Sequence, residues 1–92
     1  TVQRQVAVPS LFWRGVGATQ NGFFLECFLD EVAQAAARDP VELRRELLAH
    51  DPRALKVINL AAEKSGWAAP APPGRARGFA FVFSYGSLCA QV

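Results

Sequence analysis

Two Asp-Pro pairs, Asp39-Pro40 and Asp51-Pro52, constrain the fold of this chain most, because each marks the first residue of a helix. An aspartate just before a helix accepts hydrogen bonds from unpaired backbone N–H groups of the first turn. Proline suits the first helical position, where its missing N–H is not needed. The pairs therefore predict one short helix over 40–49 and a further helix that begins at Pro52 and ends before Gly66.

The segment before these pairs predicts a longer helix, roughly over 21–38. Apolar residues recur there at the three- and four-residue spacing of a helix, and they are Phe24, Cys27, Phe28, Val32 and Ala35. A single polar line remains, formed by Glu26, Asp30, Gln34 and Arg38. We expect this line to face solvent. A helix that is apolar around most of its circumference needs burial on more than one side, so the pattern favours a piece of a larger domain.

After the helices the hydrophobic period changes from 3.6 to 2. A stiff Pro-rich connector, residues 68–74, leads into Phe79, Phe81 and Phe83, which alternate with smaller residues as in a strand. We expect these phenylalanines to face a core, although stacking on nucleic-acid bases is an alternative role for them. Residues 84–87 suit a turn or a bulge, and Leu88, Ala90 and Val92 continue the alternation as a second strand.

The N-terminal residues 1–13 carry an extended pattern, because Val6, Ala7 and Val8 precede a proline. A glycine loop follows before the first helix. The sequence therefore predicts an α+β fold with an N-terminal strand, a Gly loop, three helices and a C-terminal β pair. We expect residues 1–92 to form a single domain or subdomain, an internal piece of a larger subunit.

Composition bounds the classes of function. Ten Lys and Arg against eight Asp and Glu give a net charge of +2, and the basic residues are scattered, which argues against a nucleic-acid binder. No apolar run approaches the ~20 residues of a membrane span. The single histidine, His50, has no neighbouring ligand that supports a zinc site. We expect Cys27 and Cys89 to be buried free thiols, with one disulfide as the alternative in an oxidising compartment.

The loop over 14–20 is the main candidate for chemistry. Gly15 and Gly17 form a Gly-X-Gly run before a helix, whose unpaired N–H groups and dipole attract anions, and Arg14 adds a positive charge. The dinucleotide-binding fingerprint is not met, because Gln20 stands at the third glycine position, and the Gly-Lys-Ser/Thr of a P-loop is absent. The loop suits a phosphate or a cofactor pyrophosphate, or it is a tight turn without a ligand.

No catalytic constellation accompanies this loop. His50 has no serine partner in a triad pattern. Glu26 and Asp30 lie one helical turn apart and could pair as acid and base, but solvation or a contact with Arg38 is the favoured interpretation.

The run from Phe12 to Phe24, FWRGVGATQNGFF, resembles a motif of the molybdenum hydroxylases, written roughly F/W-R-(G/S)-X-G-X-X-Q-N-X-F-F. That group includes xanthine dehydrogenases, aldehyde oxidases and isoquinoline 1-oxidoreductases. Further matches follow in order over 26–33, 39–44, 61–67 and 74–80, so the resemblance spans about 12–92. It is strongest to the molybdopterin-binding β subunit of isoquinoline 1-oxidoreductase-like enzymes. Two departures from xanthine dehydrogenases, Val16 for an aromatic and Ala18-Thr19 for Gly-Pro, favour that branch.

The resemblance implies that the Arg-Gly loop lies against the molybdenum–molybdopterin cofactor. The cofactor-binding residues would be Arg14, Gly15, Val16, Gly17 and Gln20. Such enzymes hydroxylate an aldehyde or N-heterocycle with oxygen from water, and electrons leave through 2Fe-2S clusters on a partner subunit. The family's catalytic glutamate lies beyond Val92, so the resemblance implies no catalytic residue and no metal ligand here.

The implied parent is a bacterial-type oxidoreductase of the cytoplasm or periplasm. Its partners would be the remainder of the large subunit, an iron–sulfur subunit and a small aldehyde or heterocycle, with neither nucleic acid nor a membrane span. Residues 1–92 alone are expected to lack the cofactor and to be inactive. The alternative is a stand-alone binding module that uses 14–20 for an anionic ligand or partner. A nucleic-acid binder using Arg75, Arg77 and the phenylalanines is a third hypothesis.

Overall fold

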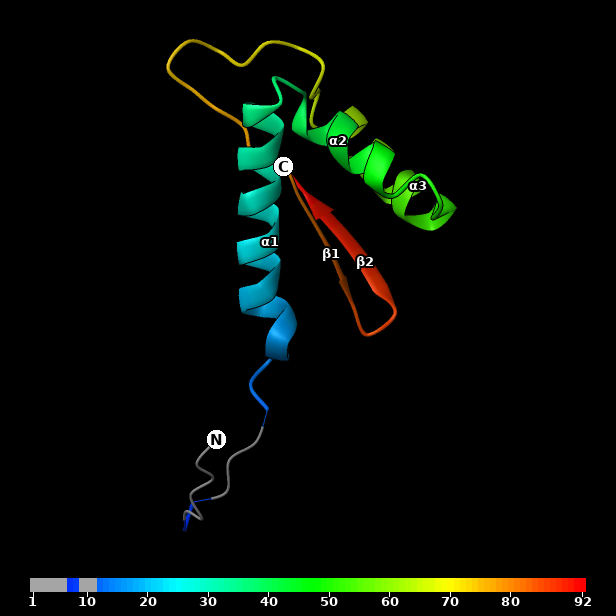
Figure 1. Ribbon diagram of the computed structural model, residues 1–92. Coiled ribbons are helices and arrows are strands. Elements are labelled where there is room, and N and C mark those ends of the chain that lie inside the picture. The colour runs from blue at the N-terminus through cyan, green and yellow to red at the C-terminus, as the bar shows by residue number, and fades with distance from the viewer. Residues whose placement is uncertain (1–6, 9–11) are drawn as a thin grey trace.

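The computed structural model describes residues 7–8 and 12–92 (Figure 1). Three helices, α1 (Val16–Ala35), α2 (Pro40–Leu47) and α3 (Pro52–Lys64), precede an antiparallel hairpin of β1 (Ala80–Ser84) and β2 (Ser87–Gln91). The predicted α+β order of three helices and a C-terminal β pair is confirmed. The strand predicted within 1–13 falls mostly outside the described residues, and its described members, 7–8 and 12–13, are not in a strand.

Both predicted helix starts at the Asp-Pro pairs are confirmed. Asp39 Oδ1 accepts hydrogen bonds from the backbone N–H groups of Val41 and Glu42, at 2.8 and 3.0 Å. Asp51 Oδ1 does the same at the start of α3, where its two bonds measure 2.9 and 3.1 Å. Each aspartate thus satisfies two N–H groups that a helix start leaves unpaired. The second helix ends two residues earlier than predicted, at Leu47.

The first helix begins at Val16, not near residue 21, so most of the predicted 14–20 loop is helical. Gly15 takes the left-handed conformation (φ 77°), and its carbonyl accepts a 2.9 Å bond from the Ala18 N–H, so the helix starts at once. The helix also ends before the predicted residue 38. Ala37 takes a positive φ of 52°, and the Arg38 N–H bonds to the Ala33 carbonyl at 2.8 Å. This six-residue closure usually has glycine where Ala37 stands, so the sequence carries no recognisable stop signal there.

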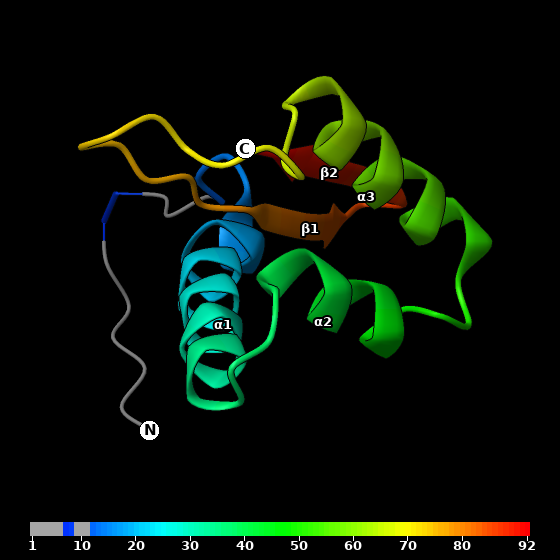
Figure 2. The ribbon, with the colours of Figure 1, turned by 90° about the horizontal axis from the view of Figure 1, so that it is seen from above.

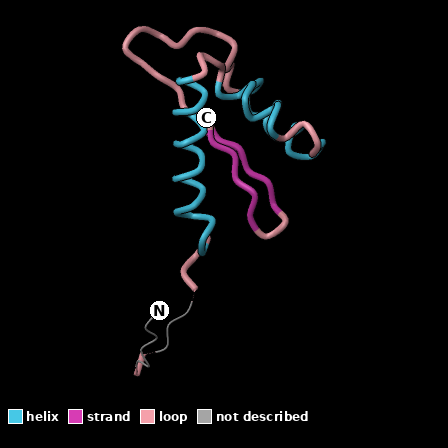
Figure 3. The backbone as a smooth tube through the Cα atoms, in the orientation of Figure 1, coloured by secondary structure: helices cyan, strands magenta, loops and turns pink. Residues whose placement is uncertain are grey.

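The core lies between α2, α3 and the hairpin, and α1 runs beside it (Figure 2). Its buried apolar residues are Val41, Ile58, Ala62 and Phe79. The Trp67 ring packs edge-on against Phe79, with centroids 5.9 Å apart. The connector after α3 loops away before it returns to β1 (Figure 3).

The hairpin closes with a two-residue turn. Tyr85 and Gly86 both have positive φ, 50° and 76°, which is the signature of a type I′ turn between Ser84 and Ser87. Of the alternating phenylalanines, Phe79 is 2% exposed and Phe81 is half-buried, as expected of a core face. Phe83, nearest the turn, is 63% exposed.

The orientation of α1 is the opposite of the predicted one. Glu26 is only 6% exposed, while Phe24 and Phe28 are 64% and 61% exposed. The prediction that the polar line faces solvent is therefore wrong for Glu26, because a buried arginine of α2 pairs with it. The two cysteines also differ from expectation. Cys27 and Cys89 are free, but both are exposed rather than buried.

Candidate functional site

The Arg14–Gly15 turn, which joins Trp13 to α1, is the first candidate site. The Val16 N–H bonds to the Trp13 carbonyl at 3.1 Å, and the Thr19 hydroxyl donates to the Arg14 carbonyl at 3.2 Å. These two bonds fold the chain sharply into the helix. The Arg14 guanidinium lies 5.9 Å from the Trp13 ring centroid, and both side chains are exposed.

Glycine is required at position 15 for two reasons. Its φ of 77° is a conformation that L side chains rarely adopt, and a Cβ there would collide with the Thr19 hydroxyl. Val16 follows with a positive φ of 44°, which is a strained conformation for a β-branched residue. No hydrogen bond from a described side chain caps this end of α1.

This turn has some features of an anion site, although the Val16 and Ala18 N–H groups already bond to backbone carbonyls. It combines an exposed arginine, a bare glycine backbone and a helix N-terminus without a side-chain cap, and helix N-termini attract anions. The predicted site residues are thus adjacent along the turn and the first helical turns, where Gln20 is exposed. The apolar cavity between α1, α2 and β1 includes Ala18 in its lining but none of Arg14, Gly15, Val16, Gly17 and Gln20.

A buried ion pair joins α1 to α2. Arg44 is 1% exposed, and its Nε donates to Glu26 Oε2 at 2.8 Å. Its Nη2 donates to the Glu26 carbonyl at 3.0 Å and its Nη1 to the Pro40 carbonyl at 2.9 Å. The same Glu26 Oε2 accepts a 2.7 Å bond from the Phe81 N–H of β1. One carboxylate therefore ties together two helices and a strand.

Two further contacts complete this junction. Asp30 Oδ1 lies 2.8 Å from Arg44 Nη1 in an ion pair whose geometry falls outside that of a hydrogen bond. The Arg44 guanidinium also lies 5.8 Å from the Phe79 ring centroid, within the range of a cation–π contact. Because its charge is neutralised and its donors are occupied within the protein, this arginine serves the fold, and the acid–base interpretation of Glu26 and Asp30 gains no support.

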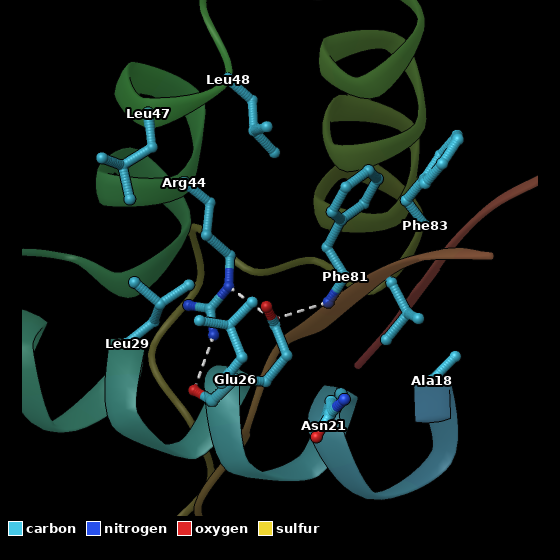
Figure 4. Close-up of a pocket in the computed structure, with 12 residues that line it drawn as sticks. Ala18, Asn21, Glu26, Leu29, Arg44, Leu47, Leu48, Phe81 and Phe83 are labelled. Carbon is cyan, nitrogen blue, oxygen red and sulfur yellow. Dashed lines mark hydrogen bonds and ion pairs between the residues drawn. The ribbon is translucent and has the colours of Figure 1, made fainter. Parts of the chain in front are cut away.

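An apolar cavity of about 420 Å³ lies beside this junction, between α1, α2 and β1 (Figure 4). Leu29, Leu47, Leu48 and Phe81 contribute side chains to its wall, and Glu26 and Arg44 reach toward each other at one side. The polar atoms of that pair are already bonded to each other. The cavity therefore offers apolar contact rather than a second charged site.

Arg77 and Asp39 hold the segment after α3 in place. Arg77 donates to the Gly66 carbonyl at 2.6 Å, bonds to the Trp67 and Ala69 carbonyls as well, and lies over the Trp67 ring. This structural role occupies one of the arginines considered for nucleic acid. Trp67 Nε1 donates to Asp39 Oδ2 at 2.9 Å.

The pKa of Asp39 reflects opposing effects. Partial burial works to raise it. The hydrogen bonds from Trp67 and from the Glu42 and Val41 N–H groups, together with the charge of Arg45, outweigh burial and hold the pKa of Asp39 below its ordinary value.

Clustered metal ligands and membrane-spanning helices are absent from residues 7–8 and 12–92. No group of three or more His, Cys, Asp or Glu side chains lies close enough there to hold a metal ion. None of the helices in these ranges has the length and apolar character needed to cross a bilayer.

Sequence reasoning missed the Glu26–Arg44 junction. The available signal was the one-turn spacing of Glu26 and Asp30 on an otherwise apolar helix. If that side of the helix is buried, its two carboxylates need a positively charged partner. Arg44 was not identified as that cation, since its neighbour Arg45 carries the same charge and the sequence does not show which one faces inward.

Two curated proteins are similar to this chain. A nicotinate dehydrogenase subunit of Pseudomonas putida is 39% identical over 84 residues, which cover 82% of this chain and 7% of that protein. The beta subunit of isoquinoline 1-oxidoreductase from Brevundimonas diminuta is 36% identical over 79 residues, which cover 83% of this chain and 10% of that protein. The chain thus spans a tenth or less of the length of these relatives. No family model and no solved structure matches it.

Both relatives are subunits of molybdenum hydroxylases, the family that the motif from Phe12 to Phe24 resembles. The agreement rests on two relatives whose alignments each cover more than four-fifths of this chain. The chain is therefore homologous to subunits of the molybdenum hydroxylase family, over a stretch that corresponds to a small part of its relatives' length.

Proposed function

We propose that this chain is the part of a molybdopterin-binding subunit that brings the Arg14–Gly15 turn to the cofactor. The parent would be an oxidoreductase that hydroxylates an aldehyde or an N-heterocycle with oxygen taken from water. The observation that carries the proposal is the 39% identity over 82% of the chain to the nicotinate dehydrogenase of Pseudomonas putida. The names of both relatives refer to N-heterocycles, which supports that substrate class.

Each residue of the turn has a role in this proposal. The Arg14 guanidinium binds an anionic group of the cofactor, and the bare backbone at Gly15 allows it close approach. Val16 and Gly17 line the adjacent pocket, and Gln20 contributes from the next turn of α1. When bound, the molybdenum cofactor supplies two-electron redox chemistry. These residues bind and orient it, and the base that the reaction needs comes from outside this chain.

The rest of the assembly is also proposed. Residues 1–92 would form a subdomain of the large subunit, with residues 68–74 as its connector. An iron–sulfur subunit that carries 2Fe-2S clusters would receive the electrons. Both relatives are named as subunits, which supports a multi-subunit parent.

Molybdenum retention in Gly15→Val tests the proposal, and Gly66→Val is the matched control. Both glycines have positive φ, 77° and 64°, so both substitutions impose backbone strain. In the complete subunit, we expect Gly15→Val to lose most of the molybdenum measured by metal analysis, and Gly66→Val to keep it. A second variant, Arg14→Gln, adds no backbone strain and should lower molybdenum content through the lost charge.

The control outcomes are equally specific. Full molybdenum content in both Gly15→Val and Arg14→Gln would contradict the role of the turn. Equal loss in Gly15→Val and Gly66→Val, with full content in Arg14→Gln, would assign the loss to folding and also contradict it. Tight phosphate binding by a complete protein of only 92 residues, without molybdenum, would instead support the stand-alone binding module.

A further inference from the structure

The outward side of α1 is an unusual surface for a protein of this size. Phe24 and Phe28 are more than half exposed, and the exposed thiol of Cys27 lies between them in the sequence. At 3.6 residues per turn, residues two positions from Glu26 point roughly 160° away from it. We call the surface formed by Phe24, Cys27, Phe28 and Val32 the outer face of α1. These residues belong to the apolar set whose three- and four-residue spacing predicts a buried helix face.

The rest of the described chain leaves Phe24 and Phe28 uncovered, while the exposed Cys27 lies at the edge of a groove that α1 shares with residues 78–80. Figures 1 and 2 both show α2, α3 and the hairpin on one side of α1. Phe23 and Leu25, which flank the outer face, are 67% and 56% exposed. Soluble monomers rarely leave so many large apolar side chains together in water, and such patches mark contact surfaces.

The charges of α1 help to decide what could cover its outer face. The helix carries Glu26, Asp30 and Glu31 and contains neither lysine nor arginine. Helices that lie on anionic membranes carry basic residues on their polar side, so a lipid surface is disfavoured. Pairing with a second copy across a two-fold axis would bring identical carboxylates of Glu31 to one interface, which is also unfavourable.

The length of the relatives points to another candidate for covering the outer face of α1. The alignments cover 7% and 10% of the two relatives, so most of a subunit of that kind lies outside the stretch described here. We propose that another segment of the same long polypeptide packs over the outer face of α1 and buries Phe24, Cys27 and Phe28. This inference rests on the proposed function in one respect, which is that the chain is part of a large subunit.

Thiol labelling of Cys27 tests this inference in the complete native subunit. The protein is treated with iodoacetamide, and modification of the Cys27 peptide is followed by mass spectrometry, with the subunit unfolded in guanidinium as the reference. We expect native Cys27 to react at least about 100-fold more slowly than the unfolded reference, because it becomes accessible only when the structure opens. Phe24→Asp should accelerate its labelling, whereas Tyr85→Asp, at the hairpin turn, should leave it unchanged.

Three results would overturn the inference. The first is native labelling of Cys27 at the unfolded rate. The second is protection that disappears on dilution, which would assign the face to a second copy. The third is a complete protein that has only these 92 residues.

Metal analysis of the same sample separates this inference from the proposed function. A protected Cys27 in a subunit without molybdenum upholds the contact surface and contradicts the cofactor role. A rapidly labelled Cys27 in a subunit with stoichiometric molybdenum contradicts the contact surface and is consistent with the cofactor role.

Discussion

Arg44 Nε donates a 2.8 Å hydrogen bond to Glu26 Oε2 where α2 meets α1, and both side chains are almost fully buried. The carboxylate also accepts the Phe81 N–H of β1 at 2.7 Å. Breaking a buried pair by removing one partner leaves an uncompensated charge in a low-dielectric environment. This junction therefore holds α1, which carries the proposed cofactor turn, against the rest of the fold.

We predict that Glu26→Ala lowers the free energy of unfolding by about 3–5 kcal/mol, because it leaves the buried Arg44 unpaired. The matched control is Glu46→Ala, which removes the exposed Arg38–Glu46 pair of 2.5 Å. Exposed pairs contribute about 0.2–1 kcal/mol, so this variant should lose less than about 1 kcal/mol. Urea unfolding of both variants measures the difference. Equal losses would show that the junction is not a special support of the fold.

The N-cap of α2 should make stability depend on pH at low pH. The pKa of Asp39 is lowered from its ordinary 3.8, so its ionised form stabilises the folded state. That contribution is fully present above the unfolded pKa and is lost as pH falls through the lower folded pKa. Unfolding free energies measured from about pH 5 to about pH 2 should decline less steeply in Asp39→Asn, which keeps the capping oxygen without the charge. Identical pH profiles for the variant and the parent would refute this assignment.

The effect of an alanine at position 22 on stability should depend on Val82, because α1 approaches β1 closely there. A Cβ at position 22 would lie 3.1 Å from Val82 Cγ2, which is tighter than ordinary contact. Alanine in a helix interior is otherwise worth about 1 kcal/mol over glycine. We predict that Gly22→Ala stabilises the protein by about that amount only in a Val82→Ala background, and that it is neutral or destabilising with Val82 present. A gain of equal size in both backgrounds, measured by thermal or urea unfolding, would disprove the close contact.

A substitution at Tyr85 in the hairpin turn should raise the stability of the protein. This residue has a φ of 50° and is 81% exposed, so it is strained and contributes little packing. Asparagine tolerates the left-handed region, and Asn-Gly is a preferred type I′ pair. Tyr85→Asn should therefore raise the unfolding free energy by up to about 1 kcal/mol, while Gly86→Ala should lower it by about 1–2 kcal/mol. If Tyr85→Asn destabilises the hairpin, measured by hydrogen exchange of β1 and β2, the turn assignment is wrong.

Local patterns predicted the elements of this fold well. Asp39 and Asp51 cap the helices that follow them, and the alternation from Phe79 marks the first strand, because each depends on residues close in sequence. The start of α1 was missed because a left-handed Gly15 can begin a helix as readily as it can form a loop. Its end was missed because Ala37 closes the helix in a position where glycine is usual.

The inward side of α1 could not be predicted from its own residues. Its apolar stripe at Phe24 and Phe28 is more regular than the side that packs, where Glu26 meets Arg44 and Ala33 is buried. The choice depends on a partner eighteen residues away and, in our proposal, on further parts of a subunit. The candidate turn was found from Arg14, Gly15 and the family motif, since its features are local. Its relation to the apolar cavity, which it does not line, required the structure.

The molybdenum content of the complete protein tests the central claim most directly. The protein should be purified from a host that synthesises molybdopterin and analysed for metal and for pterin. We predict stoichiometric molybdenum together with a pterin released on denaturation, and a substantial fall in both in Arg14→Gln. A correctly folded complete subunit that carries neither molybdenum nor pterin would contradict the account.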